Sequence, residues 1–307
     1  MRKTWRLLRD KLPTIYTYGC AAHVFDLHAK DLCGIEELET TVDEINMIVN
    51  HFNKHLQAGG LATLRSFQKE IYGKEKALKK PGKTRWNSQI DAAQSLMDSK
   101  DALTRTVNHA DFNRNTDTGK QIRNLILDAL EEEFWDRVAL LIRVLQPLRL
   151  AIICLQSDTA TMGDVYAQWI CVHSAHSEIS GTDFKNTGTK DKLLEILEQR
   201  MDFLIHPLHF VTYAFHPRYC KVSTMPRAVA RKWLIALAQD GKLGGQPDST
   251  LLKEKLNKEL NWFFGVFLSN SMYDAAWTPD EICKPPVSAR TPSASPRPPP
   301  GATAMPR

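Results

Sequence analysis

Several motifs that mark common enzymes are missing from this sequence of 307 residues. It contains no Gly-x-Gly-x-x-Gly and no Gly-x-x-x-x-Gly-Lys-Ser/Thr loop, which would cradle phosphates, and no Gly-x-Ser-x-Gly turn, which would present a serine nucleophile. Nucleotide-dependent transfer and serine hydrolysis therefore have no support. The six cysteines also lack paired spacing, and this pattern predicts reduced thiols rather than a disulfide framework.

Long uninterrupted apolar runs are absent as well. The most apolar stretch, residues 138–155, is interrupted by Arg143, Gln146, Pro147 and Arg149, whereas a membrane span needs roughly 18 or more apolar residues in a row. The first residues do not contain the apolar run and cleavage site of a secretory signal. We therefore expect no membrane partner and a location inside the cell.

Strand-like alternation is scarce, and Ile15, Tyr16 and Tyr18 form the one run that predicts a strand. Helical spacing of apolar residues dominates elsewhere, and the fold class is predicted to be mostly α. A basic connection is expected from Gly60 to Gly82. The predicted helices cover residues 4–12, 21–32, 35–56, 86–97, 122–155 with a kink or break at Pro147, 161–179 with a Thr161/Asp164 capping box, and 190–205, with further helix starts near Pro226 and Ser249.

The composition changes abruptly after residue 284. Half of the sixteen prolines fall within residues 285–307, together with serine, alanine, threonine and arginine but no acidic or aromatic side chain. Such a segment cannot bury a core, because it has too few apolar groups to offset the entropy lost on ordering. A disordered tail is therefore predicted there.

The net charge of +5 is unevenly distributed along the chain. Two stretches are strongly basic, although a run of charges is often only a solvated surface. The basic residues of the first stretch, which contains one acid, are Arg2, Lys3, Arg6, Arg9 and Lys11; those of the second, which contains two acids, are Arg65, Lys69, Lys74, Lys76, Lys79, Lys80, Lys83 and Arg85.

Four short motifs in a fixed order resemble segments of the hAT-family DNA transposases. Any one of them is weak evidence, but their order and spacing agree over roughly residues 1–220. They are Met1-Arg2-Lys3-Thr4-Trp5-Arg6-Leu7-Leu8 followed by the Cys-x-x-His segment at residues 19–27, Lys83-Thr84-Arg85-Trp86-Asn87-Ser88, Leu155-Gln156-Ser157-Asp158-Thr159-Ala160-Thr161, and the segment from Leu208 to Tyr219.

This resemblance implies an RNase H-like α/β core interrupted by a large helical insertion. Residues 1–34 would then be the end of the core, residues 35–220 the insertion, residues 221–284 a helical C-terminal segment and residues 285–307 the tail. In such cores three carboxylates hold two divalent metal ions that drive phosphoryl transfer. The family's first two acids would precede Met1, and the Ser-Glu-Arg-x-Phe-Ser segment that carries the third does not occur.

The resemblance therefore implies a partial, catalytically inactive copy with no bound cofactor, because magnesium or manganese would serve only a complete family member. The missing third-acid segment belongs to the family's dimerisation region, so a homo-oligomer is left open. The expected location is the nucleus and the expected partner is DNA, bound weakly or without sequence specificity.

The resemblance also indicates which residues would contact that DNA. Trp86 matches a tryptophan that stacks on a flipped base, a task for which a planar ring is well suited. Lys79, Lys80, Lys83 and Arg85 would place positive charge against the phosphates. The alternative for Trp86 is a core residue at the start of a helix.

Cys20 and His23 could also be taken for metal ligands, because Cys20, His23, His28 and Cys33 have the spacing of a zinc knuckle with one ligand changed. The residues between them favour a helix, on which His23, His28 and Cys33 step round the axis and cannot converge. We therefore expect no metal site. The family resemblance instead assigns Cys20 and His23 to bracing the active-site side of the core.

Four further histidines and four aspartates give no metal site either. Two histidine pairs have helical spacing but no third ligand, and four aspartates show no sign of converging. We expect solvated side chains at His51, His55, His173, His176, Asp26, Asp31, Asp91 and Asp158.

The sequence thus predicts a transposase-derived protein that retains DNA binding but not catalysis. Two alternatives remain open. The helices could form a domesticated protein-interaction module, or the chain could be a fragment of a longer, active, metal-dependent transposase.

Overall fold

The computed structural model describes residues 2–12, 15–54, 60–82, 86–127, 133–220 and 227–239, together with residues 254, 256 and 258–260. Within these ranges the chain forms twelve α-helices, one 3-10 helix and no strand. The mostly-α prediction is therefore confirmed. The predicted tail at residues 285–307 and the helix start at Ser249 lie outside the described residues.

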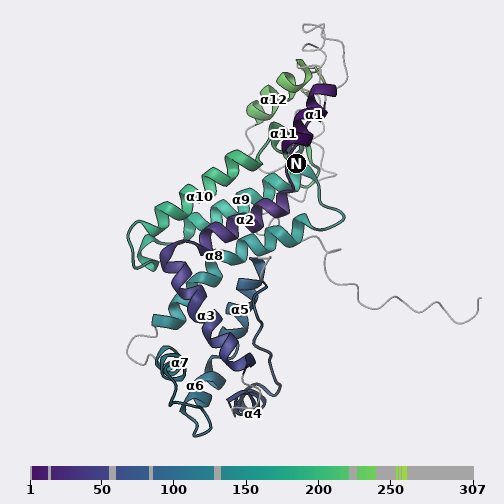
Figure 1. Ribbon diagram of the computed structural model, residues 1–307. Helices are drawn as coiled ribbons and strands as arrows, with labels where there is room; N and C mark the ends of the chain where they lie inside the picture. The colour runs from purple at the N-terminus through teal and green to yellow at the C-terminus, as the bar shows by residue number, and fades with distance from the viewer. Residues whose placement is uncertain are drawn as a thin grey trace, which may run out of the picture.

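Figure 1 shows the order of the helices. Their bounds are α1 Arg2–Lys11, α2 Ala21–Cys33, α3 Glu36–Lys54, α4 Gly60–Tyr72, α5 Asn87–Met97, α6 Lys100–Asn108, α7 Asp117–Leu127, α8 Glu133–Leu155, α9 Met162–Glu178, η1 Gly181–Asp183, α10 Thr189–Leu204, α11 Pro207–Phe215 and α12 Arg227–Gln239.

Helix α8 forms the centre of the bundle (Figure 1). It packs against α2 and α9 towards one end of the molecule and against α3, α5 and α7 towards the other. Helix α10 covers α2 and α9, and α11 lies on α9 and carries α12. At the opposite end α4, α6 and α7 pack in series.

The central place of α8 follows from its sequence, because an apolar helix must bury its surface on several sides. By length and composition α8 also qualifies as a membrane span. We expected the polar interruptions of this helix to exclude a span, and they do not. The core helix of a globular bundle meets the same criteria. Half of the most apolar 18-residue window of α8 is buried inside the bundle.

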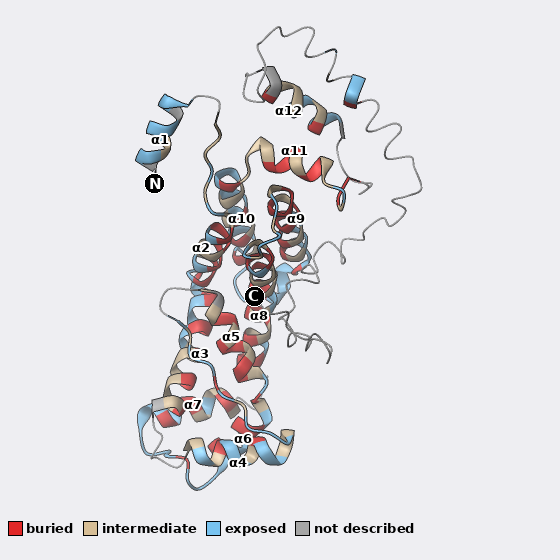
Figure 2. Cartoon of the chain, turned by 90° about the vertical axis from the view of Figure 1, so that its right-hand side faces the viewer, coloured by how far each residue is buried: buried red, intermediate tan, exposed pale blue. Residues whose placement is uncertain are grey.

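One continuous hydrophobic core runs from Val24 on α2 to Leu204 on α10, and Figure 2 shows it as the buried inner faces of the helices. Residues on both sides of the predicted boundary at residue 34 therefore share a core. A smaller cluster lies under α11 and consists of Ala167, Phe210, Tyr213, Ala214, Tyr219 and Ala230.

The apolar stripe predicted after Gly34 is confirmed. Leu38, Val42, Ile45, Val49 and Phe52 of α3 are all buried, as their spacing of three and four residues requires for one face of a helix. The last member of the predicted stripe, Leu56, lies outside the described residues.

The strand predicted at residues 15–18 is wrong, because these residues form an irregular connection. A strand needs a partner to satisfy its backbone groups, and the described chain offers none. The alternating aromatic rings pack against histidine rings instead. Tyr16 packs edge-on to His206 with ring centroids 4.7 Å apart, and Tyr18 does the same to His209 at 5.2 Å.

Two further predictions are corrected by the helix bounds. The basic connection expected from Gly60 to Gly82 contains α4 in its first half, because Leu64 supplies a buried anchor. The helix predicted over 122–155 is two helices, α7 and α8, separated by the undescribed residues 128–132. Pro147 does not end α8 but lies inside it.

The prediction of reduced cysteines holds for most of those described. Cys20, Cys33, Cys154 and Cys220 form no disulfide, whereas Cys171 takes part in one. The prediction is wrong for that residue, because spacing along a chain does not show which thiols approach one another after folding.

Candidate nucleic-acid interface

The basic segment, residues 73–82, links α4 to the start of α5 and carries four lysines and one glutamate. It begins at Gly73, whose φ of 71° lies in the left-handed region that favours glycine. The amide of Gly73 donates to the carbonyl of Lys69 at 3.0 Å and so closes the last turn of α4. Beyond it the chain runs without helical structure beside α5 (Figure 1).

Buried polar side chains hold the backbone of this segment in place. The amide of Lys76 donates to Oε1 of Gln68 at 3.0 Å, and Nε2 of Gln68 donates to Oγ of Ser99 at 2.9 Å. The amide of Lys79 donates to Oγ of Ser95 at 2.9 Å. Gln68, Ser95 and Ser99 are all buried. Since an irregular segment cannot satisfy its own backbone groups, these bonds replace those of a helix.

The middle and end of the segment are anchored in the same way. Leu78 is buried, and its carbonyl accepts a hydrogen bond from Nδ2 of Asn53 on α3 at 3.0 Å. The amide of Gly82 donates to Oγ of Ser88 on α5 at 2.6 Å. Side chains from α3, α4 and α5 therefore fix the path of the segment, while Lys74, Lys79 and Lys80 remain exposed.

A residue that the sequence analysis missed joins this basic surface. Arg149 of α8 forms an ion pair with Asp91 of α5 at 2.9 Å, and Lys79 approaches the same carboxylate at 3.6 Å. Asp91 is therefore shared between two cations rather than simply solvated. No sequence signal places Arg149 here, because the proximity arises from the packing of α5 on α8.

Trp86 lies at the end of the connection, just before α5, and is half-buried against the main core. Its backbone amide donates to Oδ1 of Asp26 on α2 at 3.0 Å. The tryptophan thus has a structural contact and a partly accessible ring at the same time. Lys83 and Arg85, the other two predicted DNA contacts, lie outside the described residues.

Cys20 and His23 are both exposed, with Cys20 directly before the first turn of α2. The other two members of the knuckle-like spacing, His28 and Cys33, are buried on the inner face of the same helix. Burial raises the pKa of the Cys33 thiol to about 12, so it is protonated at neutral pH. The bracing role of Cys20 and His23 stays a prediction.

Within the described part of the chain, no three histidine, cysteine, aspartate or glutamate side chains lie close enough together to hold a metal ion. Two aspartates predicted to be solvated have specific partners instead. Asp26 accepts from the amide of Trp86, and Asp31 accepts from Nε of Arg200 at 2.7 Å. Asp158 is exposed, as predicted.

His176 was expected to be solvated with His173, and this is wrong because its ring is buried between α8 and α9. Its Nε2 lies 2.8 Å from the carbonyl of Val144, and its ring meets His28 of α2 edge-on at 5.8 Å. Burial, together with the neighbouring His176 and Arg200, lowers the pKa of His28 to about 3. His173 is exposed, as predicted.

Two of the motif segments behind the family resemblance, residues 155–161 and 208–219, meet at Asp164. Tyr16 and Tyr18, which lie outside the motif segments, contact the start of α11 through the ring pairs described above. Thr161 and Asp164 form the predicted capping box at the start of α9. Asp164 also accepts a hydrogen bond from the hydroxyl of Tyr219. The segments 155–161 and 208–219 therefore form one packed unit.

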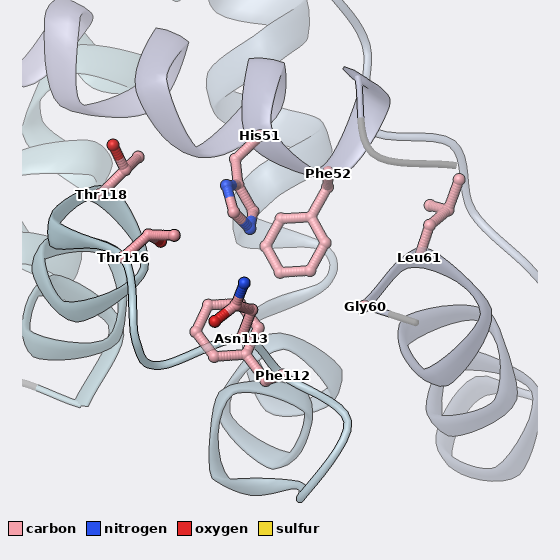
Figure 3. A pocket seen from close by; sticks show the side chains of 8 residues that line it. All are labelled: His51, Phe52, Gly60, Leu61, Phe112, Asn113, Thr116 and Thr118. Atoms are coloured by element: carbon pink, nitrogen blue, oxygen red, sulfur yellow. The ribbon is translucent and has the colours of Figure 1, made fainter. Parts of the chain in front are cut away.

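A small cavity of about 180 Å³ lies at the opposite end of the molecule (Figure 3). The rings of His51, Phe52 and Phe112 meet there, and Asn113 and Thr116 supply polar groups. His51 is half-buried and not solvated as predicted. Its predicted partner His55 lies outside the described residues.

No protein-family model, curated protein or solved structure matches this chain. The resemblance to hAT transposases therefore rests on the sequence motifs alone.

Proposed function

We propose that this protein binds DNA through the basic segment and does so chiefly without sequence specificity. The observation that supports this most directly is the anchoring of the segment's backbone by Gln68, Ser95, Asn53 and Ser88. A backbone held in this way presents its lysines without the entropy cost of ordering a loose loop on binding.

The length and charge of the segment suit a phosphate backbone. From Lys74 to Lys80 the chain can span at most about 20 Å, at roughly 3.3–3.6 Å per residue, which covers several successive phosphates of one strand. The four lysines of the segment and Arg149 outnumber the two carboxylates beside them, Glu75 and Asp91. The surface therefore keeps a net positive charge for releasing counterions from DNA.

The family resemblance supplies the wider interpretation, which is part of the same proposal. The protein would be a transposase-derived chain of RNase H-like ancestry that acts in the nucleus and has lost strand cleavage. In this proposal Trp86 would stack its half-exposed ring on an unpaired base beside the lysines.

Charge reversal of Lys79 and Lys80 tests the DNA-binding proposal. We expect the Lys79→Glu/Lys80→Glu protein to bind a short DNA duplex far more weakly than the wild type at low salt. The slope of log affinity against log salt concentration is negative, and its magnitude should decrease by about 0.9 for each phosphate that the variant no longer neutralises. The measurement is fluorescence anisotropy across a salt series.

The matched control is Lys30→Glu/Lys192→Glu, which changes the net charge by the same amount at two exposed lysines on α2 and α10. Equal reductions of affinity in both double variants would show that only net charge matters and would contradict the proposal. The same wild-type preparation should leave terminal-repeat DNA uncut in magnesium or manganese. Robust nicking would instead favour a metal-dependent nuclease.

A second candidate function is protein interaction, and exposed apolar side chains on α1 and directly after it favour it. Leu7 and Leu12 are 52% and 51% exposed, and Figure 2 shows α1 standing apart from the rest of the bundle. If wild-type protein fails to bind DNA even at low salt, this candidate gains support.

A further inference from the structure

One end of the molecule, which α1 and α12 share, gathers exposed apolar side chains (Figure 1, Figure 2). Among the described residues, nine large apolar side chains are exposed, and five of these belong to α1, to the residue directly after it or to α12. They are Leu7, Leu8, Leu12, Val229 and Trp233. Apolar side chains that gather in this way on a surface mark a contact with a partner.

Helix α1 carries its apolar and basic side chains on opposite faces. Trp5, Leu8 and Leu12 are spaced by three and four residues and so lie on one face. The amide of Leu12 donates to the carbonyl of Leu8 at 2.7 Å, which continues the helical path one residue beyond α1. Lys3 and Arg6 lie on the opposite face and are exposed. The helix is therefore amphipathic, and the bundle leaves Leu8 and Leu12 exposed.

Helix α12 has a similar arrangement. Ala230 and Leu237 form its buried inner face, and Ala230 belongs to the cluster under α11. Val229 and Trp233 lie one turn apart on another face and are each 42% exposed. Lys232 flanks that face and is exposed too. Helix α12 thus packs on the bundle through one side and presents an apolar surface with a basic neighbour on another.

The charge of the two helices is almost wholly positive. Together α1 and α12 contain eight basic residues and one acidic residue, Asp10. These two helices therefore carry a larger net positive charge than the whole chain, at +5. A matching partner is anionic and apolar at once. Duplex DNA offers phosphates to the basic residues, but it would leave the leucine and tryptophan side chains in water.

We propose that the outward faces of α1 and α12 bind an anionic lipid bilayer. A basic helix with leucine and tryptophan on one face lies in the headgroup layer, where the apolar side chains enter the boundary of the acyl chains and the basic ones meet anionic lipids. The same leucines favour the protein-interaction candidate above. Protein interfaces are depleted in lysine, however, whereas long basic side chains extend readily towards lipid headgroups.

This mode of binding needs no spanning helix. We expected no membrane partner because the sequence has no uninterrupted apolar run and no secretory signal, but a helix that lies in the interface requires neither. The proposal is independent of DNA binding, because α1 and α12 share no residue with the basic segment.

Co-sedimentation of the full chain with lipid vesicles tests the proposal. Vesicles that contain roughly one third phosphatidylserine should bind the protein far more tightly than vesicles of phosphatidylcholine alone, because anionic headgroups attract basic residues. Lys3→Gln/Arg6→Gln should weaken binding to the anionic vesicles by roughly 25-fold, or about fivefold per charge. Leu8→Gln/Trp233→Gln should weaken it by about tenfold, because two apolar side chains no longer enter the bilayer.

Two double variants at other places on the surface are the matched controls. Ile153→Gln/Ile170→Gln changes apolar residues of α8 and α9 that are 36% and 40% exposed. Lys30→Gln/Lys192→Gln removes two exposed charges from α2 and α10. Both proteins should bind anionic vesicles about as tightly as the wild type. DNA affinity should be the same in Leu8→Gln/Trp233→Gln and the wild type, so either proposal can fail alone.

The proposal is overturned if the wild-type protein does not sediment with anionic vesicles, if Leu8→Gln/Trp233→Gln binds them as tightly as the wild type, or if the control variants weaken binding equally. Self-association that is lost in Leu8→Gln/Trp233→Gln, without any binding to vesicles, would also overturn it and would assign this surface to a protein partner.

Discussion

At the residue scale, the buried carboxylate of Asp164 accepts more hydrogen bonds than its place in a capping box requires. It accepts from the amide and hydroxyl of Thr161 and also from the hydroxyl of Tyr219. Burial and the neighbouring Asp164 raise the pKa of the Tyr219 hydroxyl, so it stays protonated and remains a donor at neutral pH.

Tyr219→Phe should therefore lower the free energy of unfolding by about 1–3 kcal/mol, because it leaves a buried acceptor short of one donor. Tyr18→Phe is the control, since that ring is exposed. Chemical denaturation at pH 7 measures both. A Tyr219→Phe protein as stable as the wild type would show that the hydroxyl contributes nothing.

The residues of this cluster show what a single sequence can and cannot predict. The Thr161/Asp164 cap was predictable, because both partners lie within one helical turn. The contact from Tyr219 was not, since its partner is 55 positions away in the chain. The same holds for Arg149 beside Lys79, and for the burial of His176.

At the element scale, a single glutamate joins α3 to the segment before α10. Glu37 is nearly buried and accepts from the amides of Lys185 and Asn186 at 2.8 and 3.3 Å and from Oγ1 of Thr189 at 3.1 Å. The carboxylate thus satisfies two backbone donors of the connection before α10 and the hydroxyl of the first residue of α10. Its negative charge near this helix start also complements the helix dipole.

Glu37→Ala should destabilise the protein by about 2–4 kcal/mol, since buried donors then lose a charged acceptor. Glu39→Ala is the matched control, because Glu39 is exposed on the same turn of α3. Thermal unfolding gives the comparison. Equal shifts in the two variants would mean that the contact at α10 does not stabilise the fold.

Helices with a clear apolar stripe, such as α3 and α10, were predictable within a few residues, because their periodicity records the face that packs inward. Two kinds of element were not. Helix α4 lies in a basic stretch of the sequence, and Leu64 and Gln68 are its only buried residues. The run at residues 15–18 alternates like a strand, but its rings pack on histidines of α11 instead.

At the scale of the whole molecule, the buried histidines couple stability to pH. The pKa of His28 is lowered to about 3 and that of His209 to about 4, in both cases chiefly by burial. In the unfolded chain each ring returns to a pKa of about 6.5. Below that pH the unfolded state binds more protons than the folded state, so acid favours unfolding.

Stability should accordingly be fully retained above pH 6.5 and fall as the pH drops from there towards 4, by up to about 1.4 kcal/mol per pH unit for each buried histidine. In His28→Leu the free energy of unfolding should depend less steeply on pH, by the contribution of one buried histidine. Urea denaturation at pH 7, 6 and 5 provides the measurement. An unchanged pH dependence in His28→Leu would contradict the assignment.

The fixation of residues 73–82 by side chains of α3, α4 and α5 has a consequence for how such a surface can change. The hydrogen bonds from these helices go to main-chain atoms of the segment. They therefore do not depend on which side chains stand at positions 74, 79 and 80. Substitutions there should change the charge of this surface with little effect on folding. The charge of the surface and the stability of the protein are therefore free to evolve separately at these positions.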